Sequence, residues 1–395
     1  MYDITIVGGG IIGLATGYTL LKERPSLKIL LLEKESKIAQ HQTGHNSGVI
    51  HSGIYYKPGS SKAINCRRGI NLLLQFCNNY NIPYDMCGKI IVASDKKSLK
   101  NLSMLHERGK GNGIKGIKRL SREELLDYEP YATGIAALYC PGTGIVDYKK
   151  VCEKLSECIK EKAEIVNNEK VVSLEKRLNG ITVITENFEY KTHFLINCAG
   201  LFSDQVSKLS GIQLQTRIVP FRGEYFTLKN KAKYLVKNLI YPVPDPQYPF
   251  LGVHFTRTIN GEVEAGPNAV LAWAREGYKK TDVNISEMWD YLSYSGFWKM
   301  ARKYWSTGIS EYYRSFFKSA FVSELQKMVP EIKSSDISHS PAGVRAQALS
   351  LNGDLVDDFV LNTIDGMIHV INAPSPAATS SLAIGESIAK IYFGK

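Results

Sequence analysis

Glycines close to the start of the chain constrain its fold more than any other feature. Gly8, Gly10 and Gly13 follow a short apolar run, and a second apolar run ends at Glu33. The first glycine of such a set permits a tight turn, the second lets the backbone approach a pyrophosphate, and the third lets a helix pack close to its strand. The spacing therefore predicts a βαβ unit, with a helix from about residue 12 to 22, that binds the phosphates of a dinucleotide.

Glu33 narrows the choice of dinucleotide. It lies about twenty residues after Gly13, where an acidic side chain binds a ribose diol. An acid at this position favours FAD or NAD over a cofactor that carries a 2′-phosphate. The amino terminus of the intervening helix is expected to face the phosphates with its free N–H groups. These features predict an oxidoreductase.

Length and cysteine usage bound the class of protein. The chain has 395 residues, 44% of them hydrophobic, which is enough for two domains with separate cores. Its seven cysteines are irregularly spaced and include no CxxC pair, which disfavours zinc and a disulfide framework. The fingerprint begins close to Met1, and no run of about eighteen apolar residues is present, so we expect neither a targeting peptide nor a spanning helix. We expect a soluble, cytoplasmic protein that binds no metal.

The net charge of +11 leaves several partners open. The lysines are scattered, without a dense basic arm or a nucleic-acid motif, so we expect no nucleic acid partner. A solvated basic surface is one interpretation of the charge. Steering of a dianionic substrate and docking on an anionic membrane are the others.

Hydrophobic periodicity and turn signals predict the order of elements. A loop rich in histidine, serine and glycine spans 39–53, and Asn260-Gly261 is a hairpin signal. The expected helices are 62–80, 148–162, the aromatic-rich stretch 284–329, and 377–392. The expected strands are 171–174, 181–185, 188–197, 217–228, 239–243, 250–259, 262–265 and 367–372, with further short strands from 337.

These elements predict an α/β fold with two domains. Because the opening βαβ unit is too small to enclose a dinucleotide, later βα elements are expected to return to it. We predict a discontinuous Rossmann-like dinucleotide-binding domain, which would bind FAD or NAD, made of residues 1–80, 141–215 and 337–395. An α+β substrate domain with an antiparallel sheet would comprise 81–140 and 216–336.

Seven stretches across nearly the whole chain together resemble one family. They read HQTGHNSGVIHSGIYY (41–56), PGTGIVDY (141–148), IVPFRG (218–223), YPVP (241–244), LGVHF (251–255), PAGVRAQA (341–348) and NAPSPAATSS (372–381). The chain resembles FAD-dependent oxidoreductases of the D-amino-acid oxidase and glycine oxidase type, and within them the branch that acts on L-2-hydroxyglutarate. The resemblance narrows the cofactor to FAD.

The resemblance implies an FAD-dependent 2-hydroxy acid dehydrogenase or oxidase. The expected reaction is oxidation of L-2-hydroxyglutarate to 2-oxoglutarate, with hydride transfer to flavin and reoxidation by a quinone, dioxygen or another acceptor. An amino acid or glycerol 3-phosphate is the alternative substrate, because fold alone does not decide specificity. A flavin-containing RNA-binding or tRNA-modifying protein is the more distant alternative. The aromatic stretch from Asn284 could rest on the inner face of a membrane.

Polar residues within these motifs are the candidates for chemistry. Arg345 matches a carboxylate-binding arginine of the glycine oxidase branch, and a guanidinium clamps a carboxylate with two hydrogen bonds. His254, which alternates with apolar residues, and His51 are alternative bases for the substrate hydroxyl. Tyr55, Tyr241 and Arg222 are candidates to bind the distal carboxylate, although each could equally be a packing residue.

The expected cofactor contacts come from six parts of the chain. A helix that starts after Ser375 would place its positive end near the flavin and stabilise the reduced, anionic form. His45 is a loop contact to FAD or, as in some relatives, a covalent attachment point. The expected set is Gly8, Gly10, Ile12, Gly13, Glu33, Lys34, Thr43, His45, Asn46, Ser47, Val171, Ala199, Gly200, Ser375, Ala377, Ala378 and Thr379.

Overall fold

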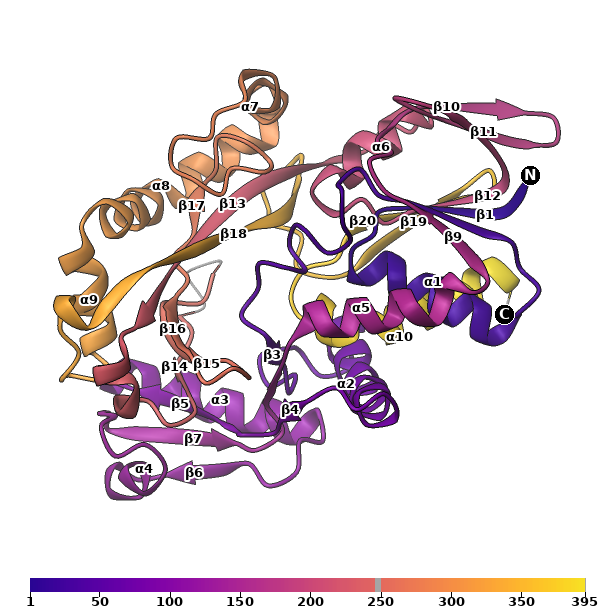
Figure 1. Cartoon of the computed structure of the whole chain (residues 1–395). Coiled ribbons are helices and arrows are strands. Elements are labelled where there is room, and N and C mark those ends of the chain that lie inside the picture. The colour runs from indigo at the N-terminus through magenta and orange to yellow at the C-terminus, as the bar shows by residue number, and fades with distance from the viewer. Residues whose placement is uncertain (246–249, 395) are drawn as a thin grey trace.

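The computed structural model describes residues 1–245 and 250–394. Its strands gather into two large sheets in separate lobes, with a small third sheet between them (Figure 1). The predicted α/β class with two domains is confirmed. The first lobe contains both ends of the described chain.

The sheet of the first lobe has a parallel centre that begins with the glycine fingerprint. Its parallel strands run in the order β20, β12, β1, β2, β9. Antiparallel strands extend it: β11 pairs with β12, β10 with β11, and β19 with β20. The strands are β1 (Tyr2–Val7), β2 (Ile29–Leu32), β9 (Ala163–Val166), β10 (Val171–Arg177), β11 (Gly180–Thr185), β12 (Glu189–Asn197), β19 (Val360–Ile364) and β20 (Met367–Asn372). Strands from both ends of the sequence therefore build one sheet.

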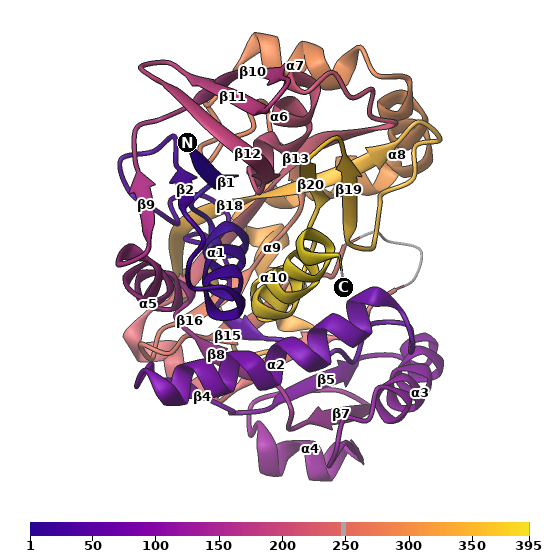
Figure 2. The same cartoon turned by 90° about the vertical axis from the view of Figure 1, so that its right-hand side faces the viewer.

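Helices cover this sheet and bury its apolar side chains. Figure 2 shows α1, from the start of the chain, beside α10, from its end, and the two helices pack together. The helices of this lobe are α1 (Ile11–Glu23), α2 (Ser61–Asn79), α5 (Tyr148–Lys160), α6 (Ser203–Leu209) and α10 (Ala377–Phe393). Ile4, Ile6, Leu14 and Ile388 are fully buried in the shared core. The predicted return of the final helix to the opening βαβ unit is confirmed.

The second lobe contains a mixed, mostly antiparallel sheet. Its order is β17, β13, β16, β15, β14, β5, β7, β6, and β18 pairs with β13; only β14 and β5 are parallel neighbours in this described sheet. The strands are β5 (Lys89–Ala93), β6 (Lys118–Leu120), β7 (Ala136–Cys140), β13 (Thr216–Leu228), β14 (Leu239–Pro242), β15 (His254–Arg257), β16 (Val263–Gly266), β17 (Val270–Leu271) and β18 (Ile337–Ser350). The predicted antiparallel sheet is confirmed.

Helices pack around this second sheet. They are α3 (Lys96–Gly111), α4 (Arg122–Tyr128), α7 (Ile285–Leu292), α8 (Ser295–Phe316) and α9 (Lys318–Gln326), with 3-10 turns η1 (Gly200–Phe202), η2 (Asn230–Leu235) and η3 (Ser334–Asp336) elsewhere. The third sheet, β3 (Val49–Ile50), β8 (Gly144–Val146) and β4 (Tyr84–Asp85), joins the lobes. The predicted helical stretch 284–329 is thus three helices.

Two predicted segments differ from the structure. Short strands were expected from 337, but β18 is one long strand that pairs with β13 over most of its length. Residues 337–350 therefore lie in the second sheet and not with the cofactor domain to which we assigned them, because pairing with a distant strand overrides the order along the chain. The strand expected at 250–259 covers only His254–Arg257. The predicted domain ranges also include 246–249 and 395, which lie outside the described residues.

Candidate functional site

A cavity of about 730 Å³ lies between the two lobes. Its lining comes from the fingerprint turn, the loop after β2, the segment after β12, the middle of β18 and the start of α10. The second lobe adds Tyr225, Tyr241, Leu251 and His254. A volume of this size is typical of cofactor and substrate sites.

The fingerprint turn shows why glycine is needed there. Gly8 has φ of +111°, and a side chain on it would lie 2.5 Å from the Cys198 carbonyl oxygen. A Cβ on Gly13 would lie 2.0 Å from the Gly8 oxygen, so only glycine lets α1 begin this close to the turn. Gly8 and Gly10 line the cavity, whereas Gly13 lies beneath it and shapes the turn.

Glu33 lies at the edge of the same cavity, as predicted from its spacing. One carboxylate oxygen accepts a hydrogen bond from the Gly9 N–H at 2.7 Å, and the other accepts from the Glu35 N–H at 2.9 Å. These bonds fix the carboxylate against the turn. It is therefore positioned where a ribose diol lies in dinucleotide sites.

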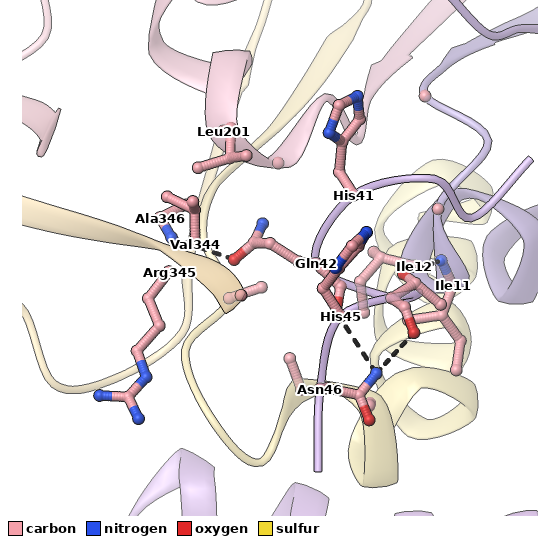
Figure 3. Close-up of a pocket in the computed structure, with 18 of the residues that line it drawn as sticks. Ile11, Ile12, His41, Gln42, His45, Asn46, Leu201, Val344, Arg345 and Ala346 are labelled. Atoms are coloured by element: carbon pink, nitrogen blue, oxygen red, sulfur yellow. Dashed lines mark hydrogen bonds between the residues drawn. The ribbon is translucent and has the colours of Figure 1, made fainter. Parts of the chain in front are cut away.

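The loop after β2 folds over the amino end of α1. Thr43 Oγ1 accepts from the Ile11 N–H at 3.1 Å, and Asn46 Nδ2 donates to the carbonyls of Gln42 and Thr43. Gln42 Oε1 accepts from the Ala346 N–H at 3.0 Å and so connects this loop to β18 (Figure 3). His45 Nδ1 lies 3.0 Å from the Ala342 carbonyl oxygen. Sequence reasoning did not include Gln42, whose role depends on a strand some 300 residues away.

The start of α10 forms another wall. Ser375, Ala377 and Ala378 line the cavity. Thr379 does not line it; its Oγ1 accepts from the His51 N–H at 3.1 Å and lies 2.9 Å from the Tyr148 hydroxyl. Thr379 therefore holds the His51 backbone in place.

Most predicted cofactor residues meet at this cavity. The lining includes Gly8, Gly10, Ile12, Glu33, Lys34, Thr43, His45, Asn46, Ser47, Val171, Ala199, Gly200, Ser375, Ala377 and Ala378. Gly13 and Thr379 support that lining from behind it. The sequence motifs far apart in the chain thus converge on one surface.

His254, His51 and Arg345 all line the end of the cavity next to the second sheet. Figure 3 shows the Arg345 guanidinium directed away from the loop that holds His45 and Asn46. Arg345 forms no ion pair with any residue of the described chain, and its guanidinium lies 5.4 Å from the centre of the Phe250 ring. A guanidinium without an ion pair in a cavity can bind a ligand carboxylate by donating two hydrogen bonds to it.

Both histidines are neutral at physiological pH. Burial, with smaller contributions from nearby positive charges, lowers the pKa of His51 and of His254 to about 3. His254 Nδ1 lies 2.8 Å from the Gly252 carbonyl oxygen, to which it donates, so Nε2 is free to accept a proton. Its ring stacks on Tyr241 with centres 3.9 Å apart. His51 Nε2 instead lies 3.3 Å from Ser375 Oγ.

Two predicted substrate residues do not line the cavity. Arg222 pairs across the sheet with Val344, next to Arg345, and adjacent residues of a strand point to opposite faces. Its guanidinium instead bonds to Glu224 and to the Lys279 carbonyl. Tyr55 lies behind the lining with a buried hydroxyl that has no hydrogen-bond partner within the described structure.

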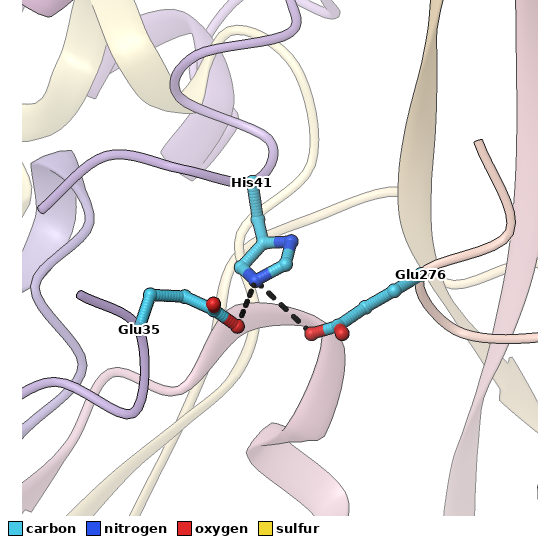
Figure 4. A group of neighbouring side chains, drawn as sticks. All are labelled: Glu35, His41 and Glu276. Carbon is cyan, nitrogen blue, oxygen red and sulfur yellow. Dashed lines mark hydrogen bonds and ion pairs between the residues drawn. The ribbon is translucent and has the colours of Figure 1, made fainter. Parts of the chain in front are cut away.

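A charged cluster closes the cavity at the fingerprint end. Glu35, His41 and Glu276 bring their polar atoms within 4.8 Å of one another (Figure 4). The Lys34 ammonium lies among them, 3.0 Å from His41 Nε2, and forms ion pairs with both carboxylates. This cluster is therefore an ion-pair network, and it connects the cofactor lobe to the loop after β17.

Sequence reasoning missed other residues near the reacting end. Tyr225 lines the cavity and its hydroxyl bonds to Arg345; burial raises the pKa of Tyr225 to about 12. Lys62 also lines the cavity and pairs with Asp357 at 2.7 Å. Lys89 is buried behind Tyr241 and Tyr55. These residues belong to no motif, so no local signal identifies them.

Known proteins resemble this chain over nearly its full length. The model of the FAD dependent oxidoreductase family matches residues 3–391. L-2-hydroxyglutarate dehydrogenase of Indibacter alkaliphilus is 51% identical over 393 residues, which cover 98% of each chain. The human mitochondrial L-2-hydroxyglutarate dehydrogenase is 47% identical over 98% of this chain and 88% of its own.

Solved structures share the fold. L-alpha-glycerophosphate oxidase of Mycoplasma pneumoniae with FAD bound has a TM-score of 0.80 at 25% identity, covering 100% of this chain and 95% of that one. Glycine oxidase of Geobacillus kaustophilus has a TM-score of 0.76 at 16% identity, with coverage of 100% and 95%. The second likeness concerns the fold alone.

Proposed function

Because the chain belongs to the family of FAD-dependent oxidoreductases, we propose that it oxidises L-2-hydroxyglutarate to 2-oxoglutarate. One observation carries the proposal: an unpaired guanidinium and two neutral imidazoles share the end of a dinucleotide cavity. The similarity to L-2-hydroxyglutarate dehydrogenases over nearly the full length supports this substrate. When FAD is bound, it would accept the electrons that leave the hydroxyl-bearing carbon of the substrate.

The residues of the first lobe fit this cofactor. Gly8 and Gly10 line the cavity, where the backbone can approach a pyrophosphate. A Cβ on Gly8 would meet the Cys198 carbonyl, so the turn needs glycine there. The Glu33 carboxylate is fixed toward the ribose position. Ala377 and Ala378 start α10, whose amino terminus favours negative charge nearby. We propose that these residues, with Thr43, Asn46 and Ala199, hold FAD.

Arg345 is the proposed carboxylate clamp. A carboxylate that pairs with its guanidinium places the adjacent hydroxyl-bearing carbon in the cavity beside His254. Tyr225 holds the guanidinium from the second sheet. Arg345 therefore both binds the substrate and orients it.

His254 is the proposed base, and His51 is the alternative. The Gly252 carbonyl fixes its tautomer, so Nε2 can take the hydroxyl proton as the carbon is oxidised. In the free protein the positive charge of Arg345 helps to keep the pKa of His254 low. Because a bound carboxylate neutralises that charge, it raises the basicity of His254 when the substrate is in place.

Anaerobic spectroscopy tests the substrate. Purified enzyme is mixed with L-2-hydroxyglutarate, D-2-hydroxyglutarate, glycine, sarcosine or glycerol 3-phosphate. We expect rapid loss of the oxidised flavin absorption with L-2-hydroxyglutarate alone. Glycerol 3-phosphate is included because a structural neighbour is a glycerophosphate oxidase. If L-2-hydroxyglutarate leaves the spectrum unchanged, the proposed substrate is wrong.

We further propose that α8 docks the protein on an anionic membrane. Five large apolar side chains on this helix are each more than half exposed and recur at intervals of three, four and seven residues: Trp298, Trp305, Ile309, Tyr313 and Phe316. Figure 1 shows α8 on the outer side of the second lobe. Exposed apolar groups on a basic helix are typical of interfacial docking.

The basic residues of α8 favour anionic lipid as the surface to which it binds. Lys299, Arg302 and Lys303 lie on the same helix, and of these Lys303 pairs with Asp354 at 3.1 Å. Glu311 is the acidic residue of the helix and already pairs with Arg314. Among the described residues no helix is both long and apolar enough to cross a bilayer. All seven cysteines are free, which supports a reducing, cytoplasmic setting on the inner membrane face. A membrane quinone is the acceptor that this location favours.

Vesicle sedimentation tests this docking. We expect the protein to sediment with phosphatidylglycerol vesicles but not with phosphatidylcholine vesicles, and we expect Trp298→Ser with Trp305→Ser to abolish sedimentation. Phe188→Ser is the matched control, because Phe188 is also exposed but lies on the first lobe. If the double variant sediments with phosphatidylglycerol vesicles as fully as wild type does, α8 is not the docking surface.

A further inference from the structure

Lys89 is a buried cation without an acidic partner. It lies on β5 with 1% of its surface exposed, and no carboxylate of residues 1–245 or 250–394 forms an ion pair with it. Buried lysines are normally paired, because removing an ammonium group from water is costly. The position therefore calls for an anion that the folded chain does not supply.

Aromatic rings surround the Lys89 ammonium. Nζ lies 4.3 Å from the centre of the Tyr55 ring and 4.7 Å from the centre of the Tyr241 ring. Ring faces attract a cation but do not neutralise its charge. The Tyr55 hydroxyl is buried nearby without a hydrogen-bond partner in the described chain.

The ammonium is close to the reacting end of the cavity. Tyr241 lines the cavity and stacks on His254, whereas Lys89 contacts Tyr241 and is not itself in the lining. The charge of Lys89 contributes to the low pKa of both His51 and His254. Its field therefore reaches the space where the substrate binds, with little solvent to screen it.

Two positive charges thus lie at this space or directly behind its wall, and neither forms an ion pair with a carboxylate of the described residues. Arg345 is one and Lys89 is the other, whereas Lys62 pairs with Asp357 and Arg222 with Glu224. One carboxylate neutralises only Arg345. A second carboxylate on the same ligand would neutralise the charge that Lys89 places in the cavity wall.

We propose that Lys89 determines specificity for a dicarboxylate, by attracting the distal carboxylate of the substrate through its buried positive charge beside Tyr241. This assignment rests on the proposed function for the identity of the substrate, but a dicarboxylate preference can be measured without turnover. Lys89 is a positioning residue, because it acts across Tyr241. The positive charges of Lys89 and Arg345 both contribute to the low pKa of His254. A dicarboxylate that neutralises both charges therefore raises the pKa of His254.

Ligand titrations of the FAD-loaded enzyme test the proposal. Glutarate and pentanoate have the same number of carbons but differ in the distal carboxylate, and each is followed by its perturbation of the flavin spectrum. In Lys89→Met we expect glutarate to bind roughly 30- to 100-fold more weakly, from charges about 6–8 Å apart at an effective dielectric constant of about 20. Pentanoate binding should stay the same.

Two further measurements distinguish specificity from a structural role. With L-2-hydroxyglutarate, Lys89→Met should raise KM far more than it lowers kcat. Its melting temperature without ligand should rise, because methionine removes an unpaired buried charge. Lys118→Met, on the exposed strand β6, is the matched control. It should change neither the ratio of the glutarate and pentanoate affinities nor the KM for L-2-hydroxyglutarate.

Wild-type enzyme alone provides a second test if Lys89→Met does not hold FAD. Burial lowers the pKa of Lys89 to about 8, so its positive charge is lost as pH rises above that value. The preference for glutarate over pentanoate should therefore decline between about pH 7 and 9.5. The ionisable groups that face Lys89 are Cys66, Cys140, Tyr55, Tyr241, His51 and His254. Where Lys89→Met does hold FAD, its flat profile assigns the change to Lys89.

Several outcomes would overturn the proposal. They are equal binding of glutarate and pentanoate by wild type, equal weakening of both ligands in Lys89→Met, and a preference that does not change with pH in wild type. If L-2-hydroxyglutarate fails to reduce the flavin while glutarate binding still depends on Lys89, the proposed reaction is wrong and the dicarboxylate subsite stands.

Discussion

At the scale of single residues, hydrogen bonding distinguishes the two candidate bases. Both imidazoles line the cavity and both are neutral, so charge state does not separate them. His254 has its Nδ1 proton fixed by the Gly252 carbonyl, whereas the Nε2 of His51 is already in contact with Ser375. The free Nε2 of His254 favours it as the proton acceptor.

Replacement of His254 by asparagine tests this assignment. The asparagine amide can still donate to the Gly252 carbonyl but cannot accept the proton, so we expect kcat to fall by about 10²- to 10⁴-fold. His51→Asn should cause a smaller loss. Steady-state kinetics with L-2-hydroxyglutarate measures both variants. A larger loss in His51→Asn would transfer the role of base to His51.

The pH profile follows from the same residue. A base works only above its pKa, and burial lowers the pKa of His254 to about 3, against 6.5 for an ordinary histidine. We therefore expect kcat/KM, which reports the free enzyme, to show no histidine-dependent fall as pH decreases from 8 to about 5. A decline centred near pH 6.5 in wild type that is absent from His254→Asn would contradict this expectation.

At the scale of elements, the fingerprint depends on backbone packing. The turn after β1 and the first residues of α1 approach so closely that a Cβ on Gly13 would overlap the Gly8 carbonyl. Backbone atoms cannot move aside as a flexible side chain can. The close approach also positions the amino end of α1 toward the cavity, where phosphates bind.

Gly13→Ala should therefore open this turn and release the cofactor. We expect the purified variant to lack the flavin absorption of wild type and to melt at a lower temperature. Gly308→Ala is the control: it lies in α8 with no atom within 4 Å of the added Cβ, and alanine stabilises a helix by up to about 1 kcal/mol over glycine. Full FAD content in Gly13→Ala would refute this account of the turn.

At the scale of the whole molecule, a buried ion-pair network connects the two lobes. Asp204 on α6 and Arg275 after β17 are 0% and 1% exposed and form two hydrogen bonds, at 2.7 and 3.0 Å. Arg275 also pairs with Asp290 of α7 at 2.8 Å. Because the cavity lies between the lobes, their relative position affects the distance between the cofactor residues and Arg345.

Removal of Arg275 should weaken this connection. We expect Arg275→Met to lower the free energy of unfolding by about 3–5 kcal/mol, because it leaves the buried Asp204 carboxylate unpaired. Chemical denaturation of the FAD-loaded enzyme measures the change. Adding Asp204→Asn should restore part of the loss, and a double variant less stable than Arg275→Met would show that the unpaired charge is not the cause.

The sequence by itself determined the features that depend on neighbouring residues. The glycine spacing, the acid at Glu33, the Asn260-Gly261 hairpin and the final helix all appear in the structure as predicted. Each depends on turn chemistry or on periodicity within one element. The resemblance of the motifs to one family identified FAD as the cofactor. Most of the residues expected to contact FAD line one cavity.

Only the tertiary structure decided the features that depend on register between distant strands. Arg345 faces the cavity whereas Arg222 bonds to Glu224, because the pairing of β13 with β18 sets which residues share a face. A shift of one residue would reverse that arrangement. Lys89 becomes a buried, unpaired charge only where β5 joins β14 beside Tyr241. Such contacts follow from long-range strand pairing, which the local sequence does not specify.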